Sequence, residues 1–321
     1  MIKRFEATKL TVYTRGMKKA SSPSYVAVLL MAYGSPTTLD DVEAYYTDIR
    51  RGRPPTPELL EALKNRYIAI AGKTNLLDIT LQQAKGLEQR LGIKTYVGMK
   101  HWHPYIRETI SEIAESGARE IVALGLAPHY STMSIGDYGA RVEKAIAEVD
   151  PRIHVTFIKG WGDDPQFIKS VCQRIDATRN EFSVPAWGAT EVIFTAHSLP
   201  ANILNADDPY VDELKETARL VADQLHLPHW QLAFQSAGRT THTWIGPDIL
   251  EVLPTIKDTG RRQVLVAPVG FTADHLEILY DLDIEAAAAA NQLDLEFKRI
   301  PSANATPAFI DAVAHVIEPF V

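Results

Sequence analysis

Short apolar runs rich in β-branched residues alternate along this chain with longer amphipathic stretches. The runs predict strands at 25–32, 94–98, 120–126, 153–158, 190–196, 229–234, 263–269 and 294–299. The stretches between them predict helices at 39–50, 56–70, 76–91, 103–116, 136–148, 165–180, 209–225, 246–258, 274–291 and 306–319. Regular alternation of strand and helix predicts βαβ units and parallel sheets covered by helices on both faces. The predicted fold class is therefore α/β.

The two halves of the chain resemble each other. Residues 26–36 and 191–200 each contain an apolar strand, an alanine, a ring residue, a small residue and a proline. The ring residue is Tyr33 in the first half and His197 in the second. This repetition predicts two similar α/β domains that face each other across a cleft.

We expect the first domain at 23–162 and the second at 163–305, followed by a helix at 306–321. The sequence leaves open whether that helix packs on the first domain. Residues 1–22 are basic and lack the apolar stretch of a secretory signal, so they are expected to form a disordered leader. Two alternatives remain for the leader: a targeting segment, or an over-long start with Met17 as the true first residue.

The composition is typical of a soluble globular protein. Of 321 residues, 46% are hydrophobic and 23% are charged, which argues against disorder. The net charge of −7 provides no basic field, so no nucleic-acid partner is expected. No apolar run approaches the roughly 20 residues of a membrane span, so no transmembrane segment is expected.

The chain has one cysteine, Cys172. An intramolecular disulfide needs two cysteines and an all-cysteine iron–sulfur cluster needs four, so neither is expected. A reducing, cytoplasmic location fits this usage. The chain also lacks a P-loop, a GxGxxG turn before a helix and a GxSxG elbow, which argues against a nucleotide-driven enzyme and a serine hydrolase.

A histidine and a glutamate follow two of the predicted apolar strands. His197 ends the run at 190–196, and Glu277 follows the run at 263–269. Ligands of open parallel sheets bind beyond the carboxyl ends of the strands, so both side chains are expected at the cleft. Such a pair can bind a divalent metal or move protons. A core histidine satisfied by backbone is the alternative.

Glu277, Asp281 and Glu285 are spaced four residues apart, so they share one face of the predicted helix. A solvated acidic face is the ordinary interpretation. The position of the helix beyond a buried strand favours a role in binding metal or moving protons. Tyr33 occupies the equivalent place in the first half, where its phenolic oxygen could approach a metal from the opposite side.

The segment from Tyr45 to Arg53 combines tyrosines with Arg50, Arg51 and Arg53. Arginine pairs bidentately with carboxylates, and tyrosine stacks on flat rings, so a planar substrate with several carboxylates would use both. A nucleic-acid contact and a plain surface loop are the alternatives. His101, just after the strand at 94–98, could contact a ligand at the edge of the cleft.

With these residues in place, the chain resembles the ferrochelatases, which insert Fe²⁺ into a porphyrin. The resemblance runs from about Ala27 to Phe320 and is closest to the soluble Gram-positive type that acts on coproporphyrin III. Its motifs are Met31 to Pro36, Tyr45 to Arg53, Ala127 to Ser131, Thr195 to Pro200, Gln235-Ser236, Trp244 to Asp248 and Val269 to Glu277. The family implies two Rossmann-like domains with parallel sheets and the porphyrin in the cleft between them.

The resemblance also implies roles for individual residues. His197 and Glu277 would be the catalytic pair that handles metal and protons, with Tyr33 as an axial metal ligand on the other porphyrin face. Asp281 and Glu285 would hold a second divalent ion such as Mg²⁺. The implied porphyrin-binding residues are Tyr33, Tyr46, Arg50, Arg51, Arg53, Thr74, His101, Ser131 and Trp244.

Two positions depart from the family pattern. Asp207 stands where the family usually has a glycine before Asp-Pro-Tyr, which alters the residue available for a turn. Lys73-Thr74-Asn75-Leu76 replaces a usual Ser-Pro-Leu, although Thr74 keeps a hydroxyl.

The expected function is insertion of Fe²⁺, as a substrate, into coproporphyrin III to give coproheme in haem biosynthesis. The alternatives are a protoporphyrin IX ferrochelatase, insertion of another divalent metal, and a haem or porphyrin carrier without chemistry. A monomer is expected, with transient contacts to other haem-pathway enzymes.

Overall fold

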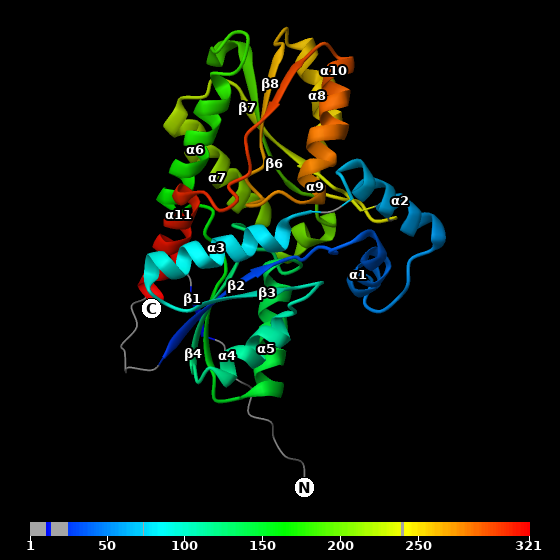
Figure 1. The fold of residues 1–321 in the computed structure, drawn as a ribbon. Coiled ribbons are helices and arrows are strands. Elements are labelled where there is room, and N and C mark those ends of the chain that lie inside the picture. Colours follow the sequence, from blue (N-terminus) through cyan, green and yellow to red (C-terminus); the bar gives the residue numbers. More distant parts are fainter. Residues whose placement is uncertain (1–10, 14–24, 73, 239–240) are drawn as a thin grey trace.

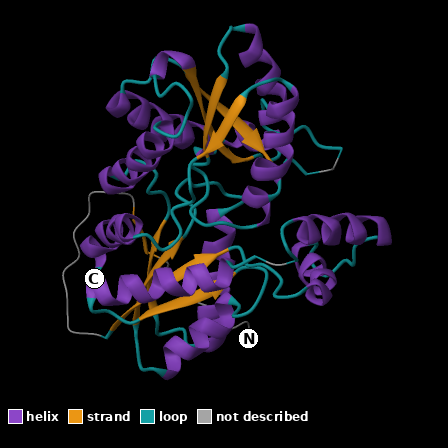
Figure 2. Cartoon of the chain, turned by 45° about the horizontal axis from the view of Figure 1, so that its top comes forward, coloured by secondary structure: helices purple, strands orange, loops and turns teal. Residues whose placement is uncertain are grey.

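The structure is a computed structural model that describes residues 11–13, 25–72, 74–238 and 241–321. It contains two parallel β-sheets, each flanked by helices (Figures 1 and 2). The first sheet has the order β1-β5-β4-β2-β3, and the second has the order β7-β6-β8-β9. The two α/β units predicted from the sequence are therefore confirmed.

Each strand predicted from the sequence forms within two residues of its predicted bounds. The strands of the first sheet are β1 (Thr11–Tyr13), β2 (Val26–Ala32), β3 (Thr95–Met99), β4 (Glu120–Gly125) and β5 (His154–Ile158). Those of the second sheet are β6 (Thr190–His197), β7 (Trp230–Gln235), β8 (Gln263–Ala267) and β9 (Glu296–Arg299).

Strand β1 is one that the sequence did not predict. It pairs in parallel with β5, with Thr11 opposite Thr156, and extends the first sheet at its edge. The predicted disordered leader at 1–22 therefore does not hold for residues 11–13, because backbone pairing to an edge strand needs no apolar pattern. The remainder of that range lies outside the described residues.

The helices of the first half are α1 (Val42–Ile49), α2 (Pro57–Ala69), α3 (Leu76–Leu91), α4 (Ile106–Glu115) and α5 (Ile135–Val149). Those of the second half are α6 (Pro165–Arg179), α7 (Tyr210–Leu225), α8 (Ile249–Asp258), α9 (Leu276–Leu279), α10 (Ala287–Gln292) and α11 (Pro307–Ile317). Short 3-10 turns occupy Leu39–Asp41, Trp187–Ala189, Ala201–Ala206 and Glu318–Phe320. None of these helices, within the described ranges, has the length and apolar character to cross a bilayer.

Strand β2 shows why both faces of the first sheet are covered. Val28 and Leu30 face the layer of helices between the two sheets, while Leu29 and Met31 face α4 and α5 on the outer side. All four side chains are fully buried. Successive side chains of a strand point to opposite faces, so a continuous apolar run is what a strand buried on both sides requires.

Helix α11 packs against both α3 and α6 (Figure 1). The contact with α3 is close, since a Cβ on Gly86 would lie 3.1 Å from the Ile310 side chain. The chain therefore returns from the second sheet to cover a helix of the first. The boundary predicted between residues 162 and 163 falls between β5 and α6, and the division into 23–162 and 163–305 stays a prediction.

The helix predicted at 274–291 is not continuous. His275 is extended, with φ −157° and ψ −176°, and α9 starts only after it. A π-helix follows at Asp281–Ala286, where the Glu285 amide bonds the Tyr280 carbonyl five residues back, before α10 resumes. π-turns of this kind are common at functional sites.

The carboxyl ends of the two sheets come close together. Thr272, after β8, donates a hydrogen bond of 2.8 Å to the carbonyl of Leu126, after β4. The N-terminal helices α1 and α2 lie beside this region and stand out from the rest of the molecule (Figure 1). Residues that follow β2, β6 and β8 are therefore positioned to form one site.

Candidate active site

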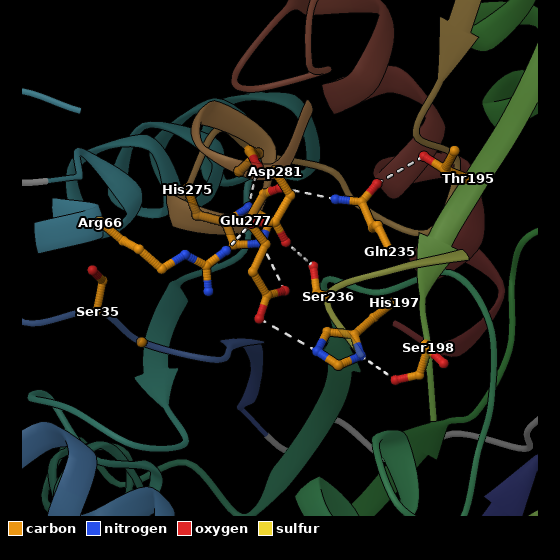
Figure 3. A network of polar contacts seen from close by, with 12 residues as sticks. Ser35, Arg66, Thr195, His197, Ser198, Gln235, Ser236, His275, Glu277 and Asp281 are labelled. Carbon is orange, nitrogen blue, oxygen red and sulfur yellow. Dashed lines mark hydrogen bonds and ion pairs between the residues drawn. The ribbon is translucent and has the colours of Figure 1, made fainter. Parts of the chain in front are cut away.

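His197 and Glu277 form an ion pair at the carboxyl edge of the second sheet (Figure 3). His197 is the last residue of β6, and Glu277 is the second residue of α9. His197 Nε2 lies 3.3 Å from Glu277 Oε1. The two side chains are 32% and 29% exposed, so they are accessible from outside. This is the pair that the sequence predicted.

The surroundings of His197 determine which of its nitrogens carries the hydrogen in the neutral ring. Nδ1 is in short contact with the backbone carbonyl of Ser198, which can only accept, so Nδ1 carries the hydrogen. Nε2 is then the basic nitrogen of the neutral ring, and it faces Glu277. The Tyr210 hydroxyl donates to the His197 carbonyl over 2.9 Å and holds this backbone in place.

Glu277 contacts a second imidazole. His275 Nε2 lies 3.5 Å from Glu277 Oε2, and His275 Nδ1 bonds the Ala273 carbonyl over 2.9 Å. The sequence reasoning assigned no role to His275, because residues two apart on a helix point in different directions. His275 is extended rather than helical, and that conformation allows its side chain and that of Glu277 to meet.

His197 and Glu277 each stabilise the charged form of the other. Burial opposes the charged form of Glu277, yet the attraction of His197 and His275 outweighs it and holds the pKa of Glu277 well below its usual range. Burial likewise opposes the charged form of His197, but the Glu277 carboxylate and the Ser198 carbonyl raise the pKa of His197 above 6.5. The site therefore holds a carboxylate beside an imidazole whose protonated form that carboxylate favours.

Tyr33 follows β2 directly and lies close enough to Glu277 for that carboxylate to act on its hydroxyl. It is 41% exposed, and its ring centroid is 4.6 Å from that of His101. Enclosure of its hydroxyl and the nearby Glu277 carboxylate raise the pKa of Tyr33, so the phenol is neutral. Lys100 Nζ lies 5.6 Å from the same ring and pairs with Asp137 at 2.8 Å.

Asp281 and Glu285 differ in their surroundings. Asp281 is 6% exposed, and its two oxygens are taken by Arg66 and by the Ser236 hydroxyl (Figure 3). Arg66 comes from α2 and also stacks over the Tyr280 ring at 4.6 Å. Glu285 is exposed. The described residues contain no group of three acidic, histidine or cysteine side chains that could hold a metal ion.

Arg66 is a further residue that the sequence did not single out, and Ser236 was part of a quoted motif but received no role. Arg66 is 215 positions from its partner, so no local pattern indicates the contact. Ser236 follows β7 with φ +62°, a conformation that is rare for a residue with a side chain and often marks a functional site. Strain of this kind is not visible in a sequence.

The sequence of this chain is similar to a family model and to two known proteins along most of its length. The family model described as "Ferrochelatase" matches residues 25–320. A ferrochelatase of Herpetosiphon aurantiacus is 42% identical over 297 residues, which cover 91% of this chain and 97% of that protein. A coproporphyrin III ferrochelatase of Geobacillus sp. is 39% identical over 300 residues, which cover 91% of this chain and 96% of that protein.

The chain belongs to the ferrochelatase family. Among solved structures, SirB from Bacillus subtilis with Fe³⁺ has a similar fold, with a TM-score of 0.60 over 92% of this chain and 95% of that one. Only 15% of its aligned residues are identical, so this likeness concerns the fold alone. The family model and the two relatives confirm the resemblance noted in the sequence as family membership, and the chain is an enzyme of the porphyrin metal chelatase class.

The arginines expected to bind porphyrin in this family member lie at the end of α1. Arg51 and Arg53 are exposed, and Arg51 adopts φ +56° in the turn. Arg50 Nε donates to the Arg53 carbonyl over 3.2 Å, and the Arg50 guanidinium lies 5.7 Å from the Tyr46 ring. Within the described part of the chain, no carboxylate pairs with these three guanidinium groups.

Two of the expected porphyrin contacts are already engaged within the protein. Ser131 is fully buried and donates to Asp208 over 3.0 Å, so it joins the two domains rather than facing solvent. His101 is bonded to Asp48 at 2.7 Å, and burial lowers the pKa of His101 to about 4, so the ring is neutral. Neither side chain is free to pair with a carboxylate.

Thr74 and Trp244, the remaining predicted contacts, lie in loops. Thr74 Oγ1 donates to Ser35 Oγ over 2.6 Å and so ties its loop to the end of β2. Trp244 packs over Gly238, where a Cβ would come within 2.3 Å of the indole ring. The porphyrin-binding roles of both residues stay predictions.

A hollow of about 630 Å³ lies away from this site. It is bordered by the start of α7, the outer edge of β7 and the loop before α8, with Leu204, Leu232 and Pro247 among its lining residues. Neither His197 nor Glu277 lines it.

Proposed function

We propose that this protein inserts Fe²⁺ into coproporphyrin III, and that the His197–Glu277 pair carries out the proton transfers. The observation that carries the proposal is the pair itself, held 3.3 Å apart at the carboxyl edge of the sheet and open to solvent. Insertion of Fe²⁺ releases the two protons of the pyrrole N–H groups. A base facing the ring centre is the group that this reaction needs.

His197 Nε2 is the base in this proposal. Its other nitrogen is committed to the Ser198 carbonyl, so only Nε2 can take a pyrrole proton. Glu277 stabilises the imidazolium that forms, and the second contact between Glu277 and His275 gives the proton a path away from the ring. Tyr33 approaches the other face of the ring as a neutral phenol. Fe²⁺ is a substrate of the reaction and not a resident cofactor.

The arginine-rich turn after α1 supports the choice of porphyrin. Coproporphyrin III carries four propionates, whereas protoporphyrin IX carries two propionates and two apolar vinyl groups. Arg50, Arg51 and Arg53 have no carboxylate partner among the described residues, so they can bind propionates without breaking an ion pair. Each such contact contributes about 1.5–3 kcal/mol when shielded and much less when open to water. The exposed positions of Arg51 and Arg53 indicate the smaller value.

The predicted outer Mg²⁺ site receives less support. Both oxygens of Asp281 are already bonded, so an ion would first have to displace Arg66. Hard cations prefer several free oxygen ligands, and Asp281 with Glu285 supplies few. No step of the mechanism passes through such an ion. The cytoplasmic location, the monomeric state and contacts with other haem-pathway enzymes also stay predictions.

The test is anaerobic incubation with Fe²⁺ and either porphyrin in the same detergent, with insertion followed by absorbance. We expect a clear preference in kcat/KM for coproporphyrin III. Replacing Arg50, Arg51 or Arg53 by Gln should raise KM for coproporphyrin III by a few-fold, while Arg219→Gln, an exposed control on α7, should not. A preference for protoporphyrin IX that is unchanged in these variants would overturn the proposal.

A further inference from the structure

Gln235 lies directly beside the catalytic histidine. It is the last residue of β7 and is paired with His197 in the register of the second sheet. Its backbone carbonyl accepts a hydrogen bond of 2.8 Å from the Ser198 amide. The residue is 1% exposed, so the polar atoms of its side chain must find partners inside the protein.

The side-chain amide of Gln235 makes two hydrogen bonds in opposite directions (Figure 3). Thr195 Oγ1 donates to Oε1 over 2.9 Å, and Nε2 donates to the backbone carbonyl of Glu277 over 2.8 Å. A carbonyl can only accept, so Nε2 must face Glu277 and Oε1 must face the Thr195 hydroxyl. The amide therefore has one orientation, and it connects β6 to α9.

The carbonyl of Glu277 needs a partner of this kind. Helix α9 has only four residues, and the π-helix begins at Asp281. Carbonyls in the last turn of a helix lack partners within that helix. Gln235 supplies a donor at the point where regular helical bonding changes, and so it holds the residue that bears the catalytic carboxylate.

We propose that Gln235 is a positioning residue that sets the separation of His197 and Glu277. The backbone carbonyl of Gln235 binds the amide of Ser198, the residue after His197. Its side-chain amide binds the backbone carbonyl of Glu277. The inference rests on the proposed function, because the separation matters to turnover only if the pair moves protons. A displacement of about 1 Å in such a group can reduce the rate by about 100-fold.

The test replaces Gln235 by Met, which keeps the length of the side chain and removes both hydrogen bonds. Gln231→Met is the matched control: Gln231 is on the same strand and bonds Glu191 at 2.9 Å, away from the pair. We expect Gln235→Met to lower kcat by about 10- to 100-fold. KM for the porphyrin should stay within about twofold, because Gln235 does not face the substrate. The control should leave both constants within about twofold.

Crystal structures of the wild type and of Gln235→Met provide a second measurement that needs no turnover. We expect the distance from His197 Nε2 to Glu277 Oε1 to exceed about 4 Å in the variant, beyond ion-pair contact. An unchanged distance with unchanged kcat would overturn the inference, as would a loss confined to KM. If the wild type inserts iron into neither porphyrin, the proposed function fails, and the distance still decides the role of Gln235.

Thr195→Val is the second variant, for the case in which Gln235→Met does not fold. It leaves Gln235 in place but removes the hydroxyl that orients its amide. The same fall in kcat is expected with a smaller magnitude, and Thr195→Ser, which retains the hydroxyl, should restore wild-type kcat. Equal activity of the Val and Ser variants would contradict the proposed orientation of the amide.

Discussion

The ends of β2 and β6 have similar sequences and similar backbone supports but present their ring residues differently. Each strand end contains an alanine followed by a ring residue, Ala32-Tyr33 at β2 and Ala196-His197 at β6, and a tyrosine hydroxyl supports each turn. Tyr45 donates to the Gly34 carbonyl over 3.2 Å, and Tyr210 donates to the His197 carbonyl over 2.9 Å. The repeated pattern therefore reports a repeated backbone arrangement.

The ring residues themselves are held to different degrees. Both nitrogens of His197 are engaged, one by Ser198 and the other by Glu277. The Tyr33 hydroxyl has no hydrogen-bond partner among the described residues, and its side chain is more exposed. A group that moves protons needs a fixed orientation, whereas a group that contacts a ligand's face needs access. The difference supports the proposal that β6 carries the chemistry and that β2 contacts the ligand.

The largest expected difference is between His197→Ala and Tyr33→Phe. Loss of the base should reduce kcat/KM by about 10³- to 10⁴-fold. Loss of the phenol oxygen should cost about tenfold or less, since the ring is retained. Steady-state kinetics of both variants measures this, with circular dichroism to check that the fold is intact. Near-normal turnover by His197→Ala would remove the assignment of chemistry to β6.

A double-mutant cycle tests whether His197 and Glu277 act as one unit. If they do, His197→Ala combined with Glu277→Gln should be only slightly less active than either single variant. Combining Tyr33→Phe with Glu277→Gln should instead give losses that multiply, because Tyr33 is proposed to contact the other face of the porphyrin. Independent losses in the first cycle would show that the ion pair is not a functional unit.

The raised pKa of His197 predicts how activity depends on pH. A neutral imidazole is needed to accept a proton, so kcat/KM of the wild type should rise with pH through a midpoint above 6.5. In Glu277→Gln the carboxylate that raises this pKa is gone, and only the Ser198 carbonyl then opposes the lowering effect of burial. The midpoint should therefore move to lower pH in that variant. A midpoint that does not move would contradict the electrostatic role given to Glu277.

The same pair contributes to stability in a defined pH window. The raised pKa of His197 gives stability that is complete below 6.5 and is lost as pH rises through the folded-state value. The lowered pKa of Glu277 gives stability that is complete above 4.5 and is lost as pH falls through its folded-state value. The difference in Tm between the wild type and Glu277→Gln should therefore be greatest between these values. We expect a few degrees at most, since both side chains are partly exposed.

Substitutions in the turns after β2 and β6 should lower the free energy of unfolding by different amounts, and this is the smallest of the expected effects. Gly34 has φ +93°, and a Cβ there would lie 2.9 Å from the backbone nitrogen of Trp102. Gly34→Ala should therefore destabilise the protein by about 1–3 kcal/mol. Ser198→Ala loses only the hydroxyl bond of 2.6 Å to the Ile245 carbonyl, which is expected to cost about 1 kcal/mol. Denaturant unfolding compares the two, and equal losses would mean that the β2 turn is not strained by a side chain.

The strands were predictable because they are buried on both faces. A strand such as β6, with seven consecutive buried residues, appears in the sequence as a short run that is apolar at its centre, from Val192 to Phe194, and the turn after it places His197 at the edge of the sheet. The pairing of His197 with Glu277 followed from the same rule, since the carboxyl ends of neighbouring parallel strands lie together. Their contact at 3.3 Å agrees with that expectation.

The supports of the site were not predictable in the same way. His275 meets Glu277 only because it is extended, and Arg66 reaches Asp281 from a distant helix. Ser131 looked like a ligand contact, but its hydroxyl is committed to Asp208. Asp207 replaces the usual glycine and keeps the turn at φ +51°, a conformation that aspartate tolerates better than most residues. Each outcome depends on tertiary contacts that no local pattern encodes.

During synthesis on the ribosome, α3 and α6 are completed long before α11. Until then, the apolar faces that α11 covers are open to water, and Phe309 and Ile317, both fully buried in the finished protein, are not yet there to shield them. A chain that ends before residue 307 therefore exposes an apolar surface on α3 in its first half and on α6 in its second half. Chaperones and proteases recognise exposed apolar surface of this kind, so they are expected to bind such a chain until α11 has docked.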